Sequence, residues 1–211
     1  MSKHRKIIYL AGFLFSIPLA LTSYVISSFL ESYLNDYSVG IVYIIASIIA
    51  IFGLMEMPRT LARLGNRHTT LMFSLASLVS LLALAFAQNK YVVIAAVIIY
   101  FISTDFIIAS LDIFIEDFSK NSGIGKLRGL YLMIINFSWV IAQMISGSII
   151  EKSSYRGIYL FSALFMMLVS VIFLLFLSDF IDPKYVKVPI LKTINHFRRN
   201  KSLLKIYFIN F

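Results

Sequence analysis

Six long apolar runs constrain the fold of this chain more strongly than any other feature of its sequence. Each run is almost uncharged and reaches the length, about 18–20 residues, that a helix needs to cross the hydrocarbon of a bilayer. The runs are apolar on every side, whereas a helix facing water has an apolar stripe. The short alternating segments of a β-barrel are absent, so the sequence predicts an all-α membrane protein. The predicted transmembrane helices are Ile7–Leu30, Gly40–Met57, Thr69–Ala87, Tyr91–Phe114, Gly129–Ile150 and Gly157–Leu177.

Composition supports this class and excludes several others. The chain is 60% hydrophobic with a mean hydropathy of +0.88, against about 45–50% apolar residues in soluble domains. It has no cysteine, which excludes disulfides, cysteine-based zinc sites and thiol catalysis. The three histidines, His4, His68 and His196, have no metal-ligand spacing, so we expect neither a metal nor a cofactor. The first apolar run exceeds the roughly 7–15 residues of a signal-peptide core, which indicates a retained helix.

The basic residues are distributed unevenly, and this distribution predicts the orientation. With the N-terminus placed inside, only Lys90, Lys152 and Arg156 of the 19 basic residues fall outside. Cytoplasmic loops are enriched in lysine and arginine, so we expect an integral protein of the plasma (inner) membrane with a cytoplasmic N-terminus. No compact soluble domain carries the net charge of +9, and therefore no nucleic-acid partner is expected.

Connection lengths predict the domain organisation. Residues 1–178 form a six-helix transmembrane domain, which the longer inside connection Ile115–Arg128 divides into a 3+3 repeat of the kind found in secondary transporters. Residues 179–200 are a cytoplasmic basic linker, for which a surface helix over Lys187–Arg199 and a solvated segment are equal alternatives. Residues 201–211 are the start of a truncated seventh helix, too short to span a bilayer. We therefore expect a fragment or a truncated gene product.

The basic loop Pro58–His68 carries a family resemblance. It is similar to the loop Gly-x-Leu-Ala-Asp-Arg-x-Gly-Arg-Lys that joins helices 2 and 3 in the major facilitator superfamily. Aligned on Gly65, the matching positions are Arg63, Gly65 and Arg67. The number of helices, their cytoplasmic ends and the long inside linker also resemble the amino-terminal half of such a transporter.

The same loop departs from the family pattern at three of the pattern's glycine or charged positions. Pro58 replaces the first glycine, Asn66 replaces a basic residue, and Ala62 replaces the acidic residue that helps to lock the inside-closed arrangement in the family. Glu56, about one and a half turns earlier, is a candidate substitute for that acidic residue.

A second resemblance lies between helices 4 and 5. Family members often have an acidic end of helix 4, a short loop and an Arg-Gly pair that enters helix 5, and here Glu116 and Arg128–Gly129 occupy these positions. The resemblance implies a secondary active transporter of a small solute, with protons as a candidate coupling ion and a second six-helix half as a partner. The cytoplasmic gate candidates are Glu56, Arg63, Gly65, Arg67, Glu116 and Arg128. A purely topological role for the arginines remains the alternative.

Asp105 is the leading candidate for proton coupling or substrate binding. It lies 14 residues after Tyr91, about 21 Å into a hydrocarbon core of about 30 Å. A carboxylate at that depth costs at least ~2.5 kcal/mol and should face a cavity or a partner. The alternative is a protonated carboxyl hydrogen-bonded to a neighbouring helix. Asp112 is a second candidate for substrate binding or proton coupling, and it lies with Glu116 near the same face as Asp105. Both are closer to the cytoplasm, where interfacial ion pairing is favoured over binding.

Predicted helices 1 and 5 contain the other substrate candidates. Asn136 and Gln143 are spaced by a heptad with Trp139 on an adjacent strip, so they can line a site or join helices. Ser23 and Tyr24 lie beyond Pro18, which should bend helix 1. The nucleophiles, metal ligands and phosphate-binding loops of a membrane enzyme are absent, so no enzyme is expected. A non-transporting membrane scaffold or assembly protein remains the alternative function.

Overall fold

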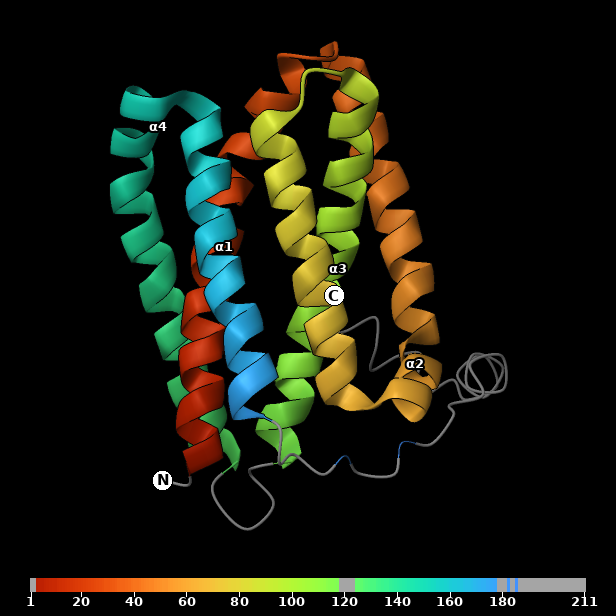
Figure 1. Ribbon diagram of the computed structural model, residues 1–211, viewed down its shortest axis with the longest axis vertical. Coiled ribbons are helices and arrows are strands. Elements are labelled where there is room, and N and C mark those ends of the chain that lie inside the picture. Colours follow the sequence, from red (N-terminus) through yellow and green to blue (C-terminus); the bar gives the residue numbers. More distant parts are fainter. Residues whose placement is uncertain (1–2, 118–123, 178–181, 183–184, 186–211) are drawn as a thin grey trace, which may run out of the picture.

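Four long α-helices form the part of the chain that the structure describes. The computed structural model describes residues 3–117, 124–177, 182 and 185, and no strand occurs among them. The helices are α1 (Lys3–Glu31), α2 (Asp36–Phe86), α3 (Lys90–Asp117) and α4 (Ile124–Phe176). All four are long and apolar enough to cross a membrane, and Figure 1 shows them as an upright bundle. The predicted all-α class is therefore confirmed.

Two of the helices are interrupted by one non-helical residue each. Gly65 in α2 has φ 77° and ψ 165°, and Ser154 in α4 has φ 57° and ψ −166°. Figure 1 shows that α2 turns back at the end of the bundle where the N-terminus lies, and α4 at the opposite end. We call residues 36–64 and 66–86 the first and second arms of α2, and residues 124–153 and 155–176 the first and second arms of α4. The described chain thus has four helices with two sharp turns in place of six separately bounded helices.

The helices pack in two close groups. α3 packs mainly against α2, and α1 packs mainly against α4, while α2 and α4 also contact each other. The largest hydrophobic cluster between them holds apolar side chains with almost no exposed surface, among them Leu30, Leu81, Phe114 and Tyr159. Because these side chains come from all four helices, this cluster joins the whole bundle.

Buried polar groups join helices that are distant in sequence. The Thr22 and Tyr100 hydroxyls share a hydrogen bond of 2.9 Å between α1 and α3. The Ser170 hydroxyl donates to the Ser74 hydroxyl across 3.0 Å between α4 and α2. Such bonds contribute on average about 0.6 kcal/mol each in a membrane protein, so they specify the register more than they stabilise the bundle.

Large apolar side chains also cover the outside of the bundle, as expected for a lipid-facing surface. On the first arm of α2 the exposed ones include Ile44, Ile48, Ile51 and Phe52. Apart from residues 182 and 185, the predicted basic linker at 179–200 and the predicted helix start at 201–211 lie outside the described residues.

Candidate functional site

Three of the predicted substrate residues meet where α1 packs against the first arm of α4. The Gln143 side-chain amide donates a hydrogen bond to the Tyr24 hydroxyl. The Tyr24 and Trp139 rings meet edge to face, with 6.2 Å between their centroids. Trp139 and Gln143 are one helical turn apart and so lie on one face of α4. We call Tyr24, Trp139 and Gln143 the aromatic–amide cluster.

The aromatic–amide cluster is open on one side. Tyr24 is 50% exposed, Gln143 is exposed and Trp139 is half-buried. Trp139 lies near the middle of the first arm of α4, and hence near the middle of a membrane that the arm crosses. An amide and a phenol supply both donors and acceptors, and an indole supplies a flat apolar wall. This is the chemistry of a site for a small amphipathic solute.

Asp105 lies near the middle of α3 and is half-buried. Its carboxyl group has no hydrogen-bond or ion-pair partner among the described residues, so the bond to a neighbouring helix that the alternative interpretation requires is not formed there. The first arm of α2 comes very close at this level. A methyl group added at Gly53 would lie 3.0 Å from the Phe106 ring, next to Asp105. Asp105 therefore lies at a tight helix crossing and has capacity to bind a proton or a donor.

Two other predicted residues bond only to their own helices. The Ser23 hydroxyl donates to the Ala20 carbonyl across 2.9 Å, and the Asn136 amide donates to the Leu132 carbonyl across 2.8 Å. Both side chains are exposed. The structure thus brings Gln143 into the cluster but leaves Asn136, its predicted companion, outside it.

Asp112 forms an ion pair at the N-terminal end of the bundle. The Arg128 guanidinium donates to Asp112 Oδ2 across 3.2 Å, and about half of each side chain is exposed. Exposed pairs of this kind contribute about 0–1 kcal/mol. Glu116, one turn further along α3, is exposed and makes no ion pair with any described residue. Arg128 therefore pairs with Asp112 instead of Glu116.

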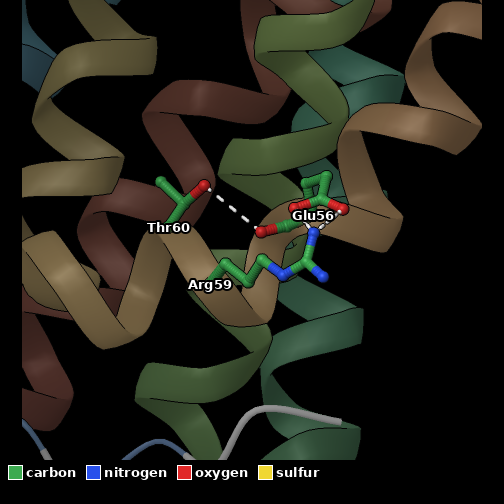
Figure 2. Close-up of polar contacts among 3 residues, drawn as sticks. All are labelled: Glu56, Arg59 and Thr60. Carbon is green, nitrogen blue, oxygen red and sulfur yellow. Dashed lines mark hydrogen bonds and ion pairs between the residues drawn. The ribbon is translucent and has the colours of Figure 1, made fainter. Parts of the chain in front are cut away.

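Glu56 forms its ion pair and hydrogen bonds with residues of its own helix, α2 (Figure 2). The Arg59 guanidinium donates to both carboxylate oxygens of Glu56, with 2.6 Å to Oε2, and the Thr60 hydroxyl donates to the Glu56 carbonyl across 3.3 Å. Glu56 lies 54% exposed and Arg59 62% exposed. Together with Arg63 and Leu64 these residues line an open pocket of about 480 Å³. Glu56, the candidate substitute for the missing acidic residue at position 62, thus already has a cationic partner.

The turn at Gly65 is held by a carboxylate from the other end of the described chain. The Asn66 backbone N–H donates to Asp182 Oδ1 across 2.6 Å. Any side chain at Gly65 would overlap the Asp182 carboxylate. Asn66 is fully buried, and its amide donates to the Ser110 carbonyl of α3 across 3.0 Å. Asp182 therefore caps the second arm of α2, at the end where free N–H groups attract negative charge.

Tyr185 supports this cap. Its hydroxyl donates to Asp182 Oδ1 across 2.9 Å. Burial raises the pKa of Tyr185, and its hydrogen bond to Asp182 and the negative charge of Asp182 raise it further. The phenol therefore stays protonated and keeps donating at any physiological pH.

Arg67 caps a different helix. Its guanidinium donates to the Leu174 carbonyl across 2.8 Å and to the Phe173 carbonyl across 3.4 Å. These are among the last carbonyls of α4, where a cation is stabilised by the helix dipole. Arg63, by contrast, is exposed and bonds to no described residue. The two family-matching arginines thus differ, since Arg67 is committed inside this chain and Arg63 is open to a partner.

The sequence pattern did not point to Asp182, Tyr185 or the structural role of Asn66. A signal for Asp182 was present, because a carboxylate follows the last apolar run while the basic loop lacks its own acidic residue at Ala62. Spacing alone does not connect them, since Asn66 and Asp182 are 116 residues apart.

Comparison with known proteins identifies one family. The family model described as Major Facilitator Superfamily matches residues 8–211. No curated protein matches the chain.

Proposed function

Because the chain belongs to the Major Facilitator Superfamily, a family of membrane transporters, we propose that it moves a small solute by secondary active transport. We propose further that it does so by alternating access, as the N-terminal half of a transporter completed by a second six-helix half. In such transporters the substrate site lies near the bilayer midplane, between repeats.

The two turns support an assignment of six membrane spans in a 3+3 arrangement. A straight helix of 51 residues, the length of α2, would extend about 77 Å, more than twice a hydrocarbon core of about 30 Å. The arms of α2 and of α4, which turn back at Gly65 and Ser154, are each of a length suited to one crossing. With α1 and α3 they make two groups of three spans.

Charge supports the orientation. Arg59, Arg63 and Arg67 surround the turn at Gly65, which lies at the same end of the bundle as the N-terminus (Figure 1). We propose that this end is cytoplasmic and that the membrane is the plasma membrane.

The observation that carries the proposal is the aromatic–amide cluster. Polar groups inside the hydrocarbon are unfavourable against lipid and normally face a cavity or a partner. Tyr24 and Gln143 are exposed in this half, so a second half would enclose them together with a solute. In this scheme Gln143 and Tyr24 orient the solute, Trp139 packs against its apolar part, and Asp105 binds the coupling proton.

Thiol labelling tests the proposal, because the natural chain has no cysteine. The variants Tyr24→Cys, Gln143→Cys and Asp105→Cys are made in the complete transporter, in which the second half is present. Each is exposed in sealed vesicles of either orientation to a membrane-impermeant maleimide. We expect labelling from both sides, because alternating access admits water to the site from each side in turn.

Val79→Cys is the matched control, since Val79 lies mid-arm in α2 and is an apolar side chain that is 64% exposed. We expect no labelling of it from either side. Labelling of the three site variants from one side only would contradict alternating access. If the three site variants were as unreactive as Val79→Cys, their side chains would lie against lipid or protein, as in a non-transporting scaffold.

A further inference from the structure

A groove between the two arms of α4 begins next to the turn at Ser154, and none of the three residues of the aromatic–amide cluster lines it. Its volume is about 700 Å³, and all the residues that line it belong to α4. The groove is therefore complete without any other helix, and its shape follows from the turn alone.

The groove is amphipathic along its length. Lys152, Ser153 and Arg156 line it beside the turn, whereas Ile145, Phe161 and Leu164 line it further into the arms. Leu164 is eight residues from Arg156, so the apolar part extends about 12 Å from the cations into the bundle. In a chain that crosses a bilayer, this direction runs from the headgroup layer into the hydrocarbon.

The two cations are not neutralised within the described residues. Neither Lys152 nor Arg156 forms an ion pair there, and Glu151, although adjacent to Lys152, does not line the groove. Both side chains are exposed. They are also two of only three basic residues that the charge distribution assigns to this side of the membrane.

Arg156 is held in place by an aromatic ring. Its guanidinium carbon lies 4.5 Å from the centroid of the Phe86 ring, at the end of α2. A guanidinium that stacks on a ring keeps its N–H donors in its own plane, where they remain free for the oxygens of a phosphate. The cation is thus partly ordered before any ligand arrives.

We infer that this groove binds an anionic phospholipid. The phosphate of the headgroup lies against Lys152 and Arg156, with the Ser153 hydroxyl as an additional donor. One acyl chain lies along Ile145, Phe161 and Leu164. Two cations without an ion pair, next to a continuous apolar groove, match the charge and shape of such a lipid. A free anion would need the cations but not the apolar groove.

A tryptophan reporter in the groove provides the test. Trp139 is the single tryptophan of the chain, so Trp139→Phe combined with Leu164→Trp moves the reporter into the groove. The purified full chain is placed in phosphatidylcholine nanodiscs containing equal fractions of brominated phosphatidylglycerol or brominated phosphatidylcholine, and quenching is measured. We expect preferential quenching by the phosphatidylglycerol probe, roughly fivefold in affinity for each cation, which corresponds to about 1 kcal/mol per basic residue.

Charge variants in the reporter background decide the result. Lys152→Gln with Arg156→Gln should remove the preference, whereas Lys90→Gln should retain it. Lys90 is a matched control because it is basic, lies at the same end, also stands over an aromatic ring (5.3 Å from the Tyr91 centroid) and does not line the groove. Circular dichroism and gel filtration check that each variant is folded.

Three outcomes of the quenching comparison would overturn the inference. They are equal quenching by the two probes, a preference that survives the double variant, and a preference lost equally in Lys90→Gln. Excess inorganic phosphate is added in a separate arm. Full displacement of the lipid probe by phosphate would mean an anion site instead of a lipid site.

Discussion

The turns at Gly65 and Ser154 both reverse the direction of a long helix, but they differ in the contacts that stabilise them. Each reverses a helix by one residue with positive φ, and they lie at opposite ends of the bundle (Figure 1). Gly65 is the residue type that tolerates such a conformation, and Asp182 holds the chain beside it. Ser154 is strained for an L-residue, exposed, and has no side-chain hydrogen bond among the described residues. We call the turn at Gly65 the locked turn, because a tertiary hydrogen bond holds the chain directly beside the turn residue. We call the turn at Ser154 the open turn, because its tertiary contacts come from the neighbouring side chains, Tyr155 with Phe29 and Arg156 with Phe86.

This difference separates two kinds of function. The locked turn carries Arg67 and Asn66, whose N–H groups donate hydrogen bonds within the chain, and leaves Arg63 exposed for a partner. The open turn leaves Lys152 and Arg156 beside an apolar groove, and neither forms an ion pair with a described residue. Basic residues near a membrane are therefore not equivalent, because their role depends on whether the chain itself neutralises or caps with them.

Among the variants that test this difference, Gly65→Ala should change the free energy of unfolding most. The added methyl group overlaps the Asp182 carboxylate, and the backbone conformation is costly for alanine, by about 1–3 kcal/mol. With the cap also weakened, we expect a loss of roughly 2–4 kcal/mol in the free energy of unfolding. Denaturant unfolding in detergent micelles measures it. A change below about 0.5 kcal/mol, the size typical of an ordinary surface substitution, would show that the turn is not locked.

Asp182→Asn should have the next largest effect. It removes the negative charge from the N-terminal end of the second arm of α2 while preserving the shape of the side chain, so we expect a loss of about 1–2 kcal/mol. The same unfolding measurement applies. Glu116→Gln is the control, because that carboxylate is exposed and makes no ion pair with the described residues. An equal loss of unfolding free energy in both variants would argue against the cap.

Ser154→Gly should act in the opposite direction. Glycine adopts the φ of 57° without the steric cost that serine incurs, and its greater freedom in the unfolded chain offsets part of this gain. We expect a net stabilisation of about 1 kcal/mol, seen as a higher midpoint of thermal unfolding. Stabilisation here alongside destabilisation in Gly65→Ala would establish the contrast, whereas a destabilised Ser154→Gly would mean that the serine side chain itself stabilises the open turn.

Arg67→Gln and Arg63→Gln should differ by the smallest amount. Loss of the Arg67 bonds to the Phe173 and Leu174 carbonyls should cost about 0.5–1 kcal/mol. Arg63→Gln should leave the unfolding free energy unchanged within about 0.5 kcal/mol. Paired unfolding curves measure both, and equal values would remove the distinction between a committed and an open arginine.

Much of the fold followed from the sequence, because hydrophobicity along a helix is a local property. The apolar runs located all the helical segments that the structure describes, including both arms of α2 and α4. The runs did not reveal that helical structure continues almost to Gly65 and Ser154, since arginines, serines and other loop-like residues there are also compatible with helix. The sharpness of each turn depends on one residue and its neighbours in space.

The candidate site was only partly predictable. The position of Asp105 near the middle of α3 follows from counting residues, and the shared face of Trp139 and Gln143 follows from helical periodicity. Asn136 fits the same periodicity, yet its amide bonds to its own helix. Periodicity places a residue on a face, but it does not determine which partner a flexible amide selects.

The sequence by itself determined the class of protein, the approximate spans and the uneven charge, because each depends on residue type summed over a short window. Only the tertiary structure decided which polar groups meet. Tyr24 and Gln143 are 119 residues apart, and Asn66 and Asp182 are 116 apart. Their contacts depend on how whole helices are positioned against one another, and that positioning is set by packing across the entire core.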